Sequence, residues 1–420
     1  MVRDEILART HAGSNGGRDV KQEESCRQQG IALGSCRGRL NWPDDYQSWE
    51  KLAAHCDSID QLSDLEKEQA KRSFTFLRGE LGEDFLVRAY SEGHPLAANI
   101  GNLAPWTRRW VAHFADSLRE LQTAENYSRL LTLLKSKERA AEALLTTKFA
   151  AMLSKAGFGV TIDPPITVQG VEKVPDLRLI DAASGEELYV EVSASHVSVV
   201  ERDAHEMGWL LLRPLMGVPI LRYTARFYKS LSRPHLISLV WQIAELAYRV
   251  RQDGAFRELV IEDVLELGVA PEHDVEMLNR WGAPRGLSAG TIEGPPYNVD
   301  EVHRTQQKVK REQRQLPPDR PNVLIIESLR LFLRSRDIVK IVSELEETVY
   351  EYPHLLAVVI SGSITGRART DVKTKGQHVF VQRAAFGLVQ EYYLLLLNRF
   401  CELKVSPSVI SSLYGAFRPT

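Results

Sequence analysis

The sequence predicts an α/β protein in which helices flank a mixed β-sheet, with an N-terminal helical domain and a helical insertion. Three observations support this fold class. Residues 41–134 carry apolar side chains at three- and four-residue spacing, as amphipathic helices do. A helix, short alternating segments and a turn follow over residues 135–194. Later, two apolar strand-like runs, NVLIIESL and LLAVVISG, alternate with helical segments, which is the order of a layered α/β domain.

Composition limits the classes of function. The 420 residues include 53 Lys+Arg and 55 Asp+Glu, for a formal net charge of −2. This balance excludes a uniformly basic coat, so any nucleic-acid site must be a local patch. The four cysteines form no C-x-x-C pair, which excludes a zinc ribbon and disfavours a disulfide framework. Without an apolar run of ~18 residues or a signal-peptide core, we expect a cytoplasmic protein with no membrane segment.

The first two segments differ in their apolar content. Residues 1–40 are poor in large apolar side chains and predict a flexible tail. Residues 41–134 predict a helical accessory domain, which would suit contact with a second copy or a partner subunit. Its aromatic stripe, including Trp106 and Trp110, is expected in a packed core rather than as a base-stacking platform.

Residues 135–405 predict the α/β domain proper. The helix KERAAEALLTTKFAAMLSKA ends at Gly157, and the segments GVTIDPPI, VPDLRLID and ELYVEVSAS are strand-like. Residues 197–300 predict a helical insertion. The helix DEVHRTQQKVKREQRQL, the two apolar strands with a helix between them, and a basic hairpin loop complete the domain. Residues 406–420 are expected to form a C-terminal tail.

The hairpin around Ala183-Ser184-Gly185 predicts a pair of carboxylates. Folding about this turn places Asp176 beside Glu191, with both side chains on one face of the sheet. Their repulsion is costly unless a cation lies between them. Converging oxygen ligands suit Mg²⁺ better than zinc.

The preceding helix offers a third carboxylate. Glu142 continues the stripe of Leu145, Phe149 and Met152 that should face the sheet, so it is expected to approach the same cation. The alternative is that Glu142 lies at the edge of the stripe, in water.

Pro175-Asp176 and Glu191-Val192-Ser193, following a helix that bears Glu142, resemble the PD-(D/E)XK restriction-endonuclease-like superfamily. That family has an α-β-β-β-α-β core, in which an Asp and a Glu on successive strands bind Mg²⁺, often with a first-helix Glu. The resemblance covers roughly residues 130 to 405. It implies that Asp176, Glu191, Glu142 and the Val192 carbonyl bind Mg²⁺, with Mn²⁺ as a substitute, and that the three carboxylates are catalytic.

One position departs from the family. Ser193 occupies the usual lysine position, and serine cannot position a water by positive charge. We expect Lys308, on the helix before NVLIIESL, to supply the lysine, with Gln315 as a second polar contact; Lys308, Glu312 and Gln315 share one helical face. The alternative is a solvated basic helix beside a site that binds metal or DNA without cutting.

Two basic patches are expected to contact the phosphates of a duplex. They consist of Arg304, Lys310, Arg311 and Arg314, and of Arg367, Arg369, Lys373 and Lys375. We therefore interpret the chain as a Mg²⁺-dependent endonuclease that hydrolyses DNA phosphodiester bonds, in defence against foreign DNA or in repair. Two interpretations stay open beside it: an inactive nuclease-fold subunit that binds nucleic acid or acts as a scaffold, and a toxin or effector that cuts RNA.

Overall fold

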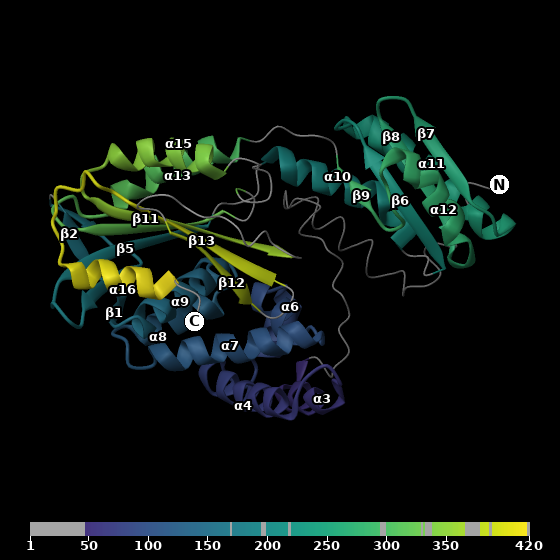
Figure 1. Ribbon diagram of the computed structural model, residues 1–420. Coiled ribbons are helices and arrows are strands. Elements are labelled where there is room, and N and C mark those ends of the chain that lie inside the picture. Colours follow the sequence, from purple (N-terminus) through teal and green to yellow (C-terminus); the bar gives the residue numbers. More distant parts are fainter. Residues whose placement is uncertain are drawn as a thin grey trace. The chain divides into compact units, whose positions relative to one another are not determined.

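The computed structural model in Figure 1 describes residues 47–168, 170–194, 199–216, 220–294, 300–328, 331, 338–365, 379–385 and 389–417. The predicted tail at 1–40 and the basic loop that carries Arg367, Arg369, Lys373 and Lys375 lie outside these residues. The chain divides into two compact units. One is built from Arg39–Ser195 and Asp300–Thr420, and the other contains His196–Val299.

The first unit is mixed α/β, as predicted, and contains a seven-stranded sheet. Its strand order is β1-β4-β5-β10-β11-β13-β12. The strands are β1 (Phe158–Ile162), β4 (Leu177–Asp181), β5 (Glu187–Ala194), β10 (Asn322–Glu327), β11 (Leu355–Thr365), β12 (Val379–Ala385) and β13 (Val389–Leu397). Neighbours β5, β10 and β11 run parallel, and the other neighbouring pairs are antiparallel. A separate hairpin pairs β2 (Ile166–Val168) with β3 (Val171–Lys173).

Helices cover both faces of this sheet (Figure 1). Helices α9 (Ala140–Lys155) and α16 (Pro407–Phe417) pack on one face, and α13 (Glu301–Glu312) and α15 (Ile338–Tyr350) on the other. The alternation of β5 follows from this arrangement, since Leu188, Val190 and Val192 join the core beneath α9 whereas Tyr189 joins the core beneath α13. The alternation expected of the strand-like segment ELYVEVSAS is therefore confirmed.

The helix α16 corrects the prediction of a C-terminal tail. Its residues Val409, Leu413, Ala416 and Phe417 are buried, and the rings of Phe417 and Tyr393 lie 5.6 Å apart. Apolar residues at 409, 413 and 416–417 carry the helical period, so this segment buries the face it would otherwise expose.

Six helices precede α9 in the described part of the chain, in agreement with the helical pattern of residues 41–134. They are α3 (Trp49–His55), α4 (Asp64–Leu81), α5 (Phe85–Glu92), α6 (Pro95–Gly101), α7 (Pro105–Leu121) and α8 (Tyr127–Lys135). They do not form a separate domain, because Leu118, Leu134 and Phe149 belong to one continuous core with the sheet. Trp110 stacks on Phe114 at 5.2 Å, within the packed side chains that the stripe predicted.

The second unit corrects the prediction of a helical insertion at 197–300. It contains α10 (Val199–Met216), α11 (Arg233–Asp253) and α12 (Val275–Gly282), but also a four-stranded sheet of order β7-β8-β6-β9. The strands are β6 (Leu221–Phe227), β7 (Arg257–Ile261), β8 (Leu265–Pro271) and β9 (Ile292–Glu293). Leu265, Leu267 and Val269 alternate into the core that α10 and α11 complete, a period of two that the strong helical pattern of α11 obscured.

Within the described ranges, no helix has the length and apolar character needed to cross a bilayer. Two of the cysteines, Cys56 and Cys401, fall within those ranges, and both are free thiols.

Candidate functional site

The β4–β5 hairpin places Asp176 beside Glu191, as the turn predicts. Leu177 pairs with Val190, so Asp176 precedes β4 at the position opposite Glu191. The backbone N–H of Val192 donates to Oδ2 of Asp176 at 2.7 Å. Gly185 closes the turn with φ 74°, a left-handed conformation that glycine adopts without strain. The local sequence therefore fixes the first two carboxylates of the site.

The carboxylate of Glu191 is buried and incompletely satisfied. Glu191 is 9% exposed, and its Oε2 has no hydrogen-bond partner among the described residues. Burial raises its pKa to about 9, and the nearby charges of Asp176 and Glu312 act in the same direction. Burial likewise raises the pKa of Asp176 to about 7, although the Val192 N–H opposes this. A divalent cation would offset both charges and satisfy the orphaned oxygen, so the two residues fit a metal.

No group of three His, Cys, Asp or Glu side chains in the described part of the chain is arranged to hold a metal ion. Glu142, the predicted third carboxylate, does not lie on the buried stripe of α9. Its side chain is 52% exposed and lies 3.1 Å from Arg139. Glu142 is one position around the helix from Ala143, which is buried, so the edge-of-stripe alternative holds. Its charge still contributes to the raised pKa of Asp176.

Lys308 lies against the end of β5. It is 9% exposed, its Nζ donates to the Ala194 carbonyl, and the same atom lies 3.8 Å from Oε1 of Glu312. Burial lowers the pKa of this ammonium, and Glu312 opposes that shift. Lys308 therefore reaches the strand that bears Glu191 and Ser193, whereas a lysine of a solvated basic helix would point into water.

Glu312 is a member of the site that the sequence assigned no role. It is buried on α13, and its Oε1 accepts a hydrogen bond from Ser193 Oγ at 3.1 Å. Arg311 donates to the same oxygen, and Gln315 Nε2 donates to Oε2 at 3.3 Å. Burial alone would raise the pKa of Glu312, but Arg311 and Ser193 hold it below its usual value. The contact predicted for Gln315 is therefore made to Glu312. Glu312 lies four residues after Lys308 on the same helical face, and this spacing was the sequence signal that could have identified it.

Asp163, which directly follows β1, was also missed. Its backbone N–H donates to the Asp176 carbonyl at 2.9 Å, and its carboxylate lies 2.7 Å from Nε of Arg129. Asp163 is buried, burial raises its pKa, and its charge contributes to the raised pKa of both Asp176 and Glu191. An acidic residue inside the strand-like segment GVTIDPPI, directly before Pro164-Pro165, was its only signal.

The first basic patch is largely paired with acidic side chains. Arg304 lies 2.9 Å from Glu301, and Lys310 lies 3.6 Å from Glu351. Arg311 pairs with Glu312, while Arg314 is exposed in the turn after α13. The patch therefore presents less free positive charge than its sequence indicates.

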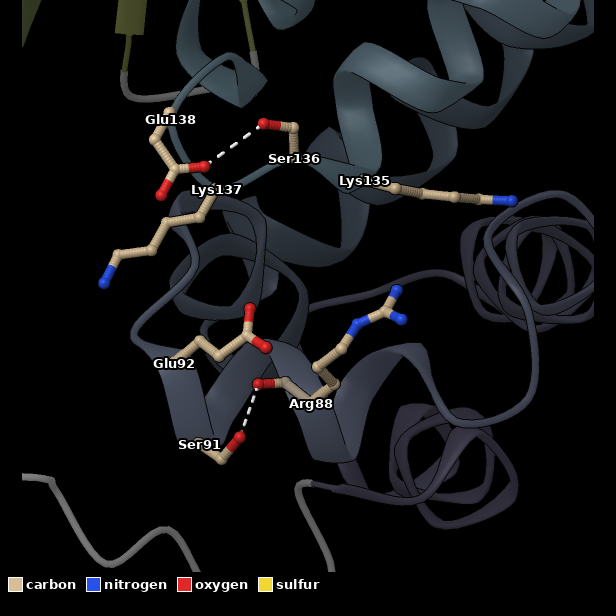
Figure 2. Close-up of a pocket in the computed structure, with 7 residues that line it drawn as sticks. All are labelled: Arg88, Ser91, Glu92, Lys135, Ser136, Lys137 and Glu138. Atoms are coloured by element: carbon tan, nitrogen blue, oxygen red, sulfur yellow. Dashed lines mark hydrogen bonds between the residues drawn. The ribbon is translucent and has the colours of Figure 1, made fainter.

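A polar depression lies at the surface between α5 and the segment that leads into α9 (Figure 2). Its lining residues are Arg88, Ser91, Glu92, Lys135, Ser136, Lys137 and Glu138. Ser136 Oγ donates to Glu138 at 3.3 Å, and Ser91 Oγ donates to the Arg88 carbonyl at 2.7 Å. None of the predicted site residues lines it, so the depression is separate from the carboxylate pair.

A second buried charge cluster lies on the face of the sheet that α9 covers. Lys148 of α9 lies 3.0 Å from Glu391 of β13, and Tyr393 donates to the same carboxylate. Burial raises the pKa of nearby Glu327. Because Lys148 and Glu391 neutralise each other, this cluster is a paired contact between α9 and the sheet.

The raised pKa values of Asp176 and Glu191 predict that the free energy of unfolding depends on pH when metal ions are removed by a chelator. Asp176 and Glu191 bind their protons more tightly in the folded chain than in the unfolded one, where carboxyl pKa values are about 4. Their contribution to stability is therefore full below about pH 4 and is lost as the pH rises through about 7 and 9. Urea unfolding with EDTA should show this loss across that window.

Glu191→Gln supplies the matched control, because it removes one titrating group and keeps the shape of the side chain. The difference in unfolding free energy between Glu191→Gln and the wild type should grow in favour of the variant as the pH rises from 5 to 9. A difference independent of pH would contradict the raised pKa of Glu191.

Comparison of the whole chain with protein-family models, with curated proteins and with solved structures finds no match in any of the three.

Proposed function

We propose that the chain is a Mg²⁺-dependent endonuclease that hydrolyses DNA, built on a restriction-endonuclease-like core. The order α9, β1, β4, β5, α13, β10 follows the α-β-β-β-α-β order of that core. The single observation that carries the proposal is the buried pair Asp176 and Glu191, with an orphaned Glu191 oxygen and Lys308 at the end of the same strand.

The roles of the residues follow from their positions. Asp176 and Glu191 would hold Mg²⁺, and the Val192 carbonyl stays a predicted ligand. When bound, the ion supplies Lewis-acid chemistry to a phosphodiester. Lys308 would offset the negative charge that develops on the phosphate, because its ammonium lies at the end of the strand that bears Glu191. Glu312 would position Lys308, since it lies one helical turn away and is itself fixed by Ser193 and Gln315.

Incubation of the purified chain with supercoiled plasmid tests the proposal. We expect cleavage with Mg²⁺ or Mn²⁺ and none with EDTA. Binding of the plasmid without cleavage in either metal would favour the scaffold interpretation. Cleavage of RNA but not of DNA would favour the toxin or effector interpretation.

Binding to a duplex is expected to weaken steeply with salt, since its contacts are to phosphates. Arg314→Ala should reduce the slope of log K against log salt by about 0.9, the value for one phosphate contact. Fluorescence anisotropy of a labelled duplex in EDTA measures this slope.

Arg280→Ala is the matched control, because Arg280 is an exposed arginine paired with Glu276 in the second unit. It should leave the slope unchanged. A slope near zero for the wild-type chain would contradict a phosphate-dominated interface.

A further inference from the structure

The backbone at the end of β1 is held in an uncommon conformation. Asp163 has φ 45°, in the left-handed region that only a few per cent of non-glycine residues adopt. Three hydrogen bonds hold this position: Asp163 N–H to the Asp176 carbonyl at 2.9 Å, Ile162 N–H to the Glu125 carbonyl at 3.0 Å, and Asn126 Nδ2 to the Ile162 carbonyl at 2.9 Å. Such conformations persist where the surrounding structure over-determines them, and they cluster at functional sites. Asp163 is thereby fixed directly beside Asp176.

The side chain of Asp163 forms an ion pair with an arginine from a helix outside the sheet. Arg129 of α8 approaches its Oδ2 to 2.7 Å. Arg129 is 54% exposed while the Asp163 side chain is 12% exposed, so the guanidinium covers the carboxylate from the solvent side. An incoming phosphate can therefore reach Arg129, and arginine–phosphate pairs are bidentate and strong.

The carboxylate pair lacks ligands for a hard cation. Mg²⁺ takes six oxygens, and among the described residues Asp176 and Glu191 supply two carboxylates, which leaves positions for a further ligand. Independently, Oε2 of Glu191 is buried without a hydrogen-bond partner among the described residues, and Glu191 is 9% exposed. Asp163 lies beside Asp176, whose carbonyl accepts its backbone N–H at 2.9 Å, and the Asp163 charge acts on both carboxylates.

We propose that Asp163 is a third carboxylate of the cation site, and that its ion pair with Arg129 withholds it until an anionic nucleic-acid backbone takes Arg129. This inference rests on the proposed function. In this scheme, binding of the duplex releases Asp163 from Arg129 and so strengthens binding of the metal ion. Binding of the metal ion strengthens binding of the duplex by the same factor. The metal site is then completed only when substrate is present.

Titration of the full chain with Mn²⁺, with and without a short duplex, tests the inference by calorimetry. Without duplex, Arg129→Gln should bind Mn²⁺ roughly 5- to 10-fold more tightly than wild type, at the low end of known site–site couplings. Asp163→Asn should bind within about twofold of wild type, because Asp163 is already withheld there, and Asp163→Asn/Arg129→Gln should lose the tightening. With duplex, wild type should tighten by a similar factor, whereas Arg129→Gln and Asp163→Asn should not tighten further.

Arg139→Gln is the matched control. It removes the same charge from the same neighbourhood, but Arg139 pairs with Glu142, so the pair of Asp163 with Arg129 remains. Arg139→Gln should retain the duplex effect. Equal tightening by Arg139→Gln and Arg129→Gln would overturn the inference, because the effect would then be a general change of charge.

The outcomes separate the inference from the proposed function. Mn²⁺ binding that Asp176→Ala removes but Arg129→Gln leaves unchanged would contradict the inference alone. Absence of Mn²⁺ binding and of cleavage in the wild-type chain would contradict the proposed function and, with it, the inference. Asparagine also adopts the left-handed region, so Asp163→Asn should keep the backbone; if it does not fold, the comparison of Arg129→Gln with Arg139→Gln decides.

Discussion

Replacement of Asp176 or of Glu191 by alanine is expected to reduce Mg²⁺-dependent plasmid cleavage by at least about 1,000-fold. Each variant removes one of two carboxylates that would hold the cation, and loss of several kcal/mol of Lewis-acid stabilisation corresponds to roughly this factor. Initial rates of plasmid nicking at a fixed Mg²⁺ concentration measure the effect. Asp319→Ala, an exposed aspartate in a turn of the same unit, should cut at the wild-type rate.

The folded state should survive these changes, which distinguishes loss of chemistry from loss of structure. Asp176→Ala removes the acceptor of the Val192 N–H, and an unpaired buried donor costs about 1–3 kcal/mol. Asp176→Asn keeps that acceptor and removes the charge, so it should be inactive and at least as stable as wild type in EDTA. Undiminished cleavage by Asp176→Asn and by Glu191→Ala would contradict the assignment of this pair.

Local sequence was sufficient to predict the hairpin that carries the candidate site. A single turn at Gly185 and strict alternation along β4 and β5 determine which side chains share a face. The pairing of β5 with β10, more than a hundred residues later, was not predictable from local pattern. The strands of the second unit were missed because they lie on both sides of the long helix α11, whose helical period dominates the segment.

Prediction of the site itself failed where geometry depends on distant segments. Glu142 lies one position off the buried stripe of α9, and a difference of 100° around a helix decides between water and core. Asp163 pairs with Arg129 of α8, and Glu312 of α13 contacts Ser193 of β5, so both contacts join distant segments. The position of Lys308 beside β5 agrees with the expectation taken from the family resemblance, whereas its role stays a prediction.

Lys308→Met is expected to reduce the rate of cleavage by about 100- to 1,000-fold, the usual cost of removing one preorganised group that stabilises charge in a transition state. Methionine retains most of the buried stem, and Ser193, Arg311 and Gln315 still satisfy Glu312, so the fold should persist. Because Lys308 is 9% exposed, duplex affinity in EDTA should change less than about threefold. Single-turnover cleavage and anisotropy measure the two effects separately.

Lys310→Met is the matched control on the same helix. The Lys310 side chain is 40% exposed and pairs with Glu351, so its loss should weaken duplex binding slightly and leave the cleavage step unchanged. If Lys308→Met cuts as fast as Lys310→Met, Lys308 has no part in the chemistry. Lys308 would then not replace the lysine that is missing at Ser193. If cleavage by the wild-type chain is also weak, the result would favour the scaffold interpretation.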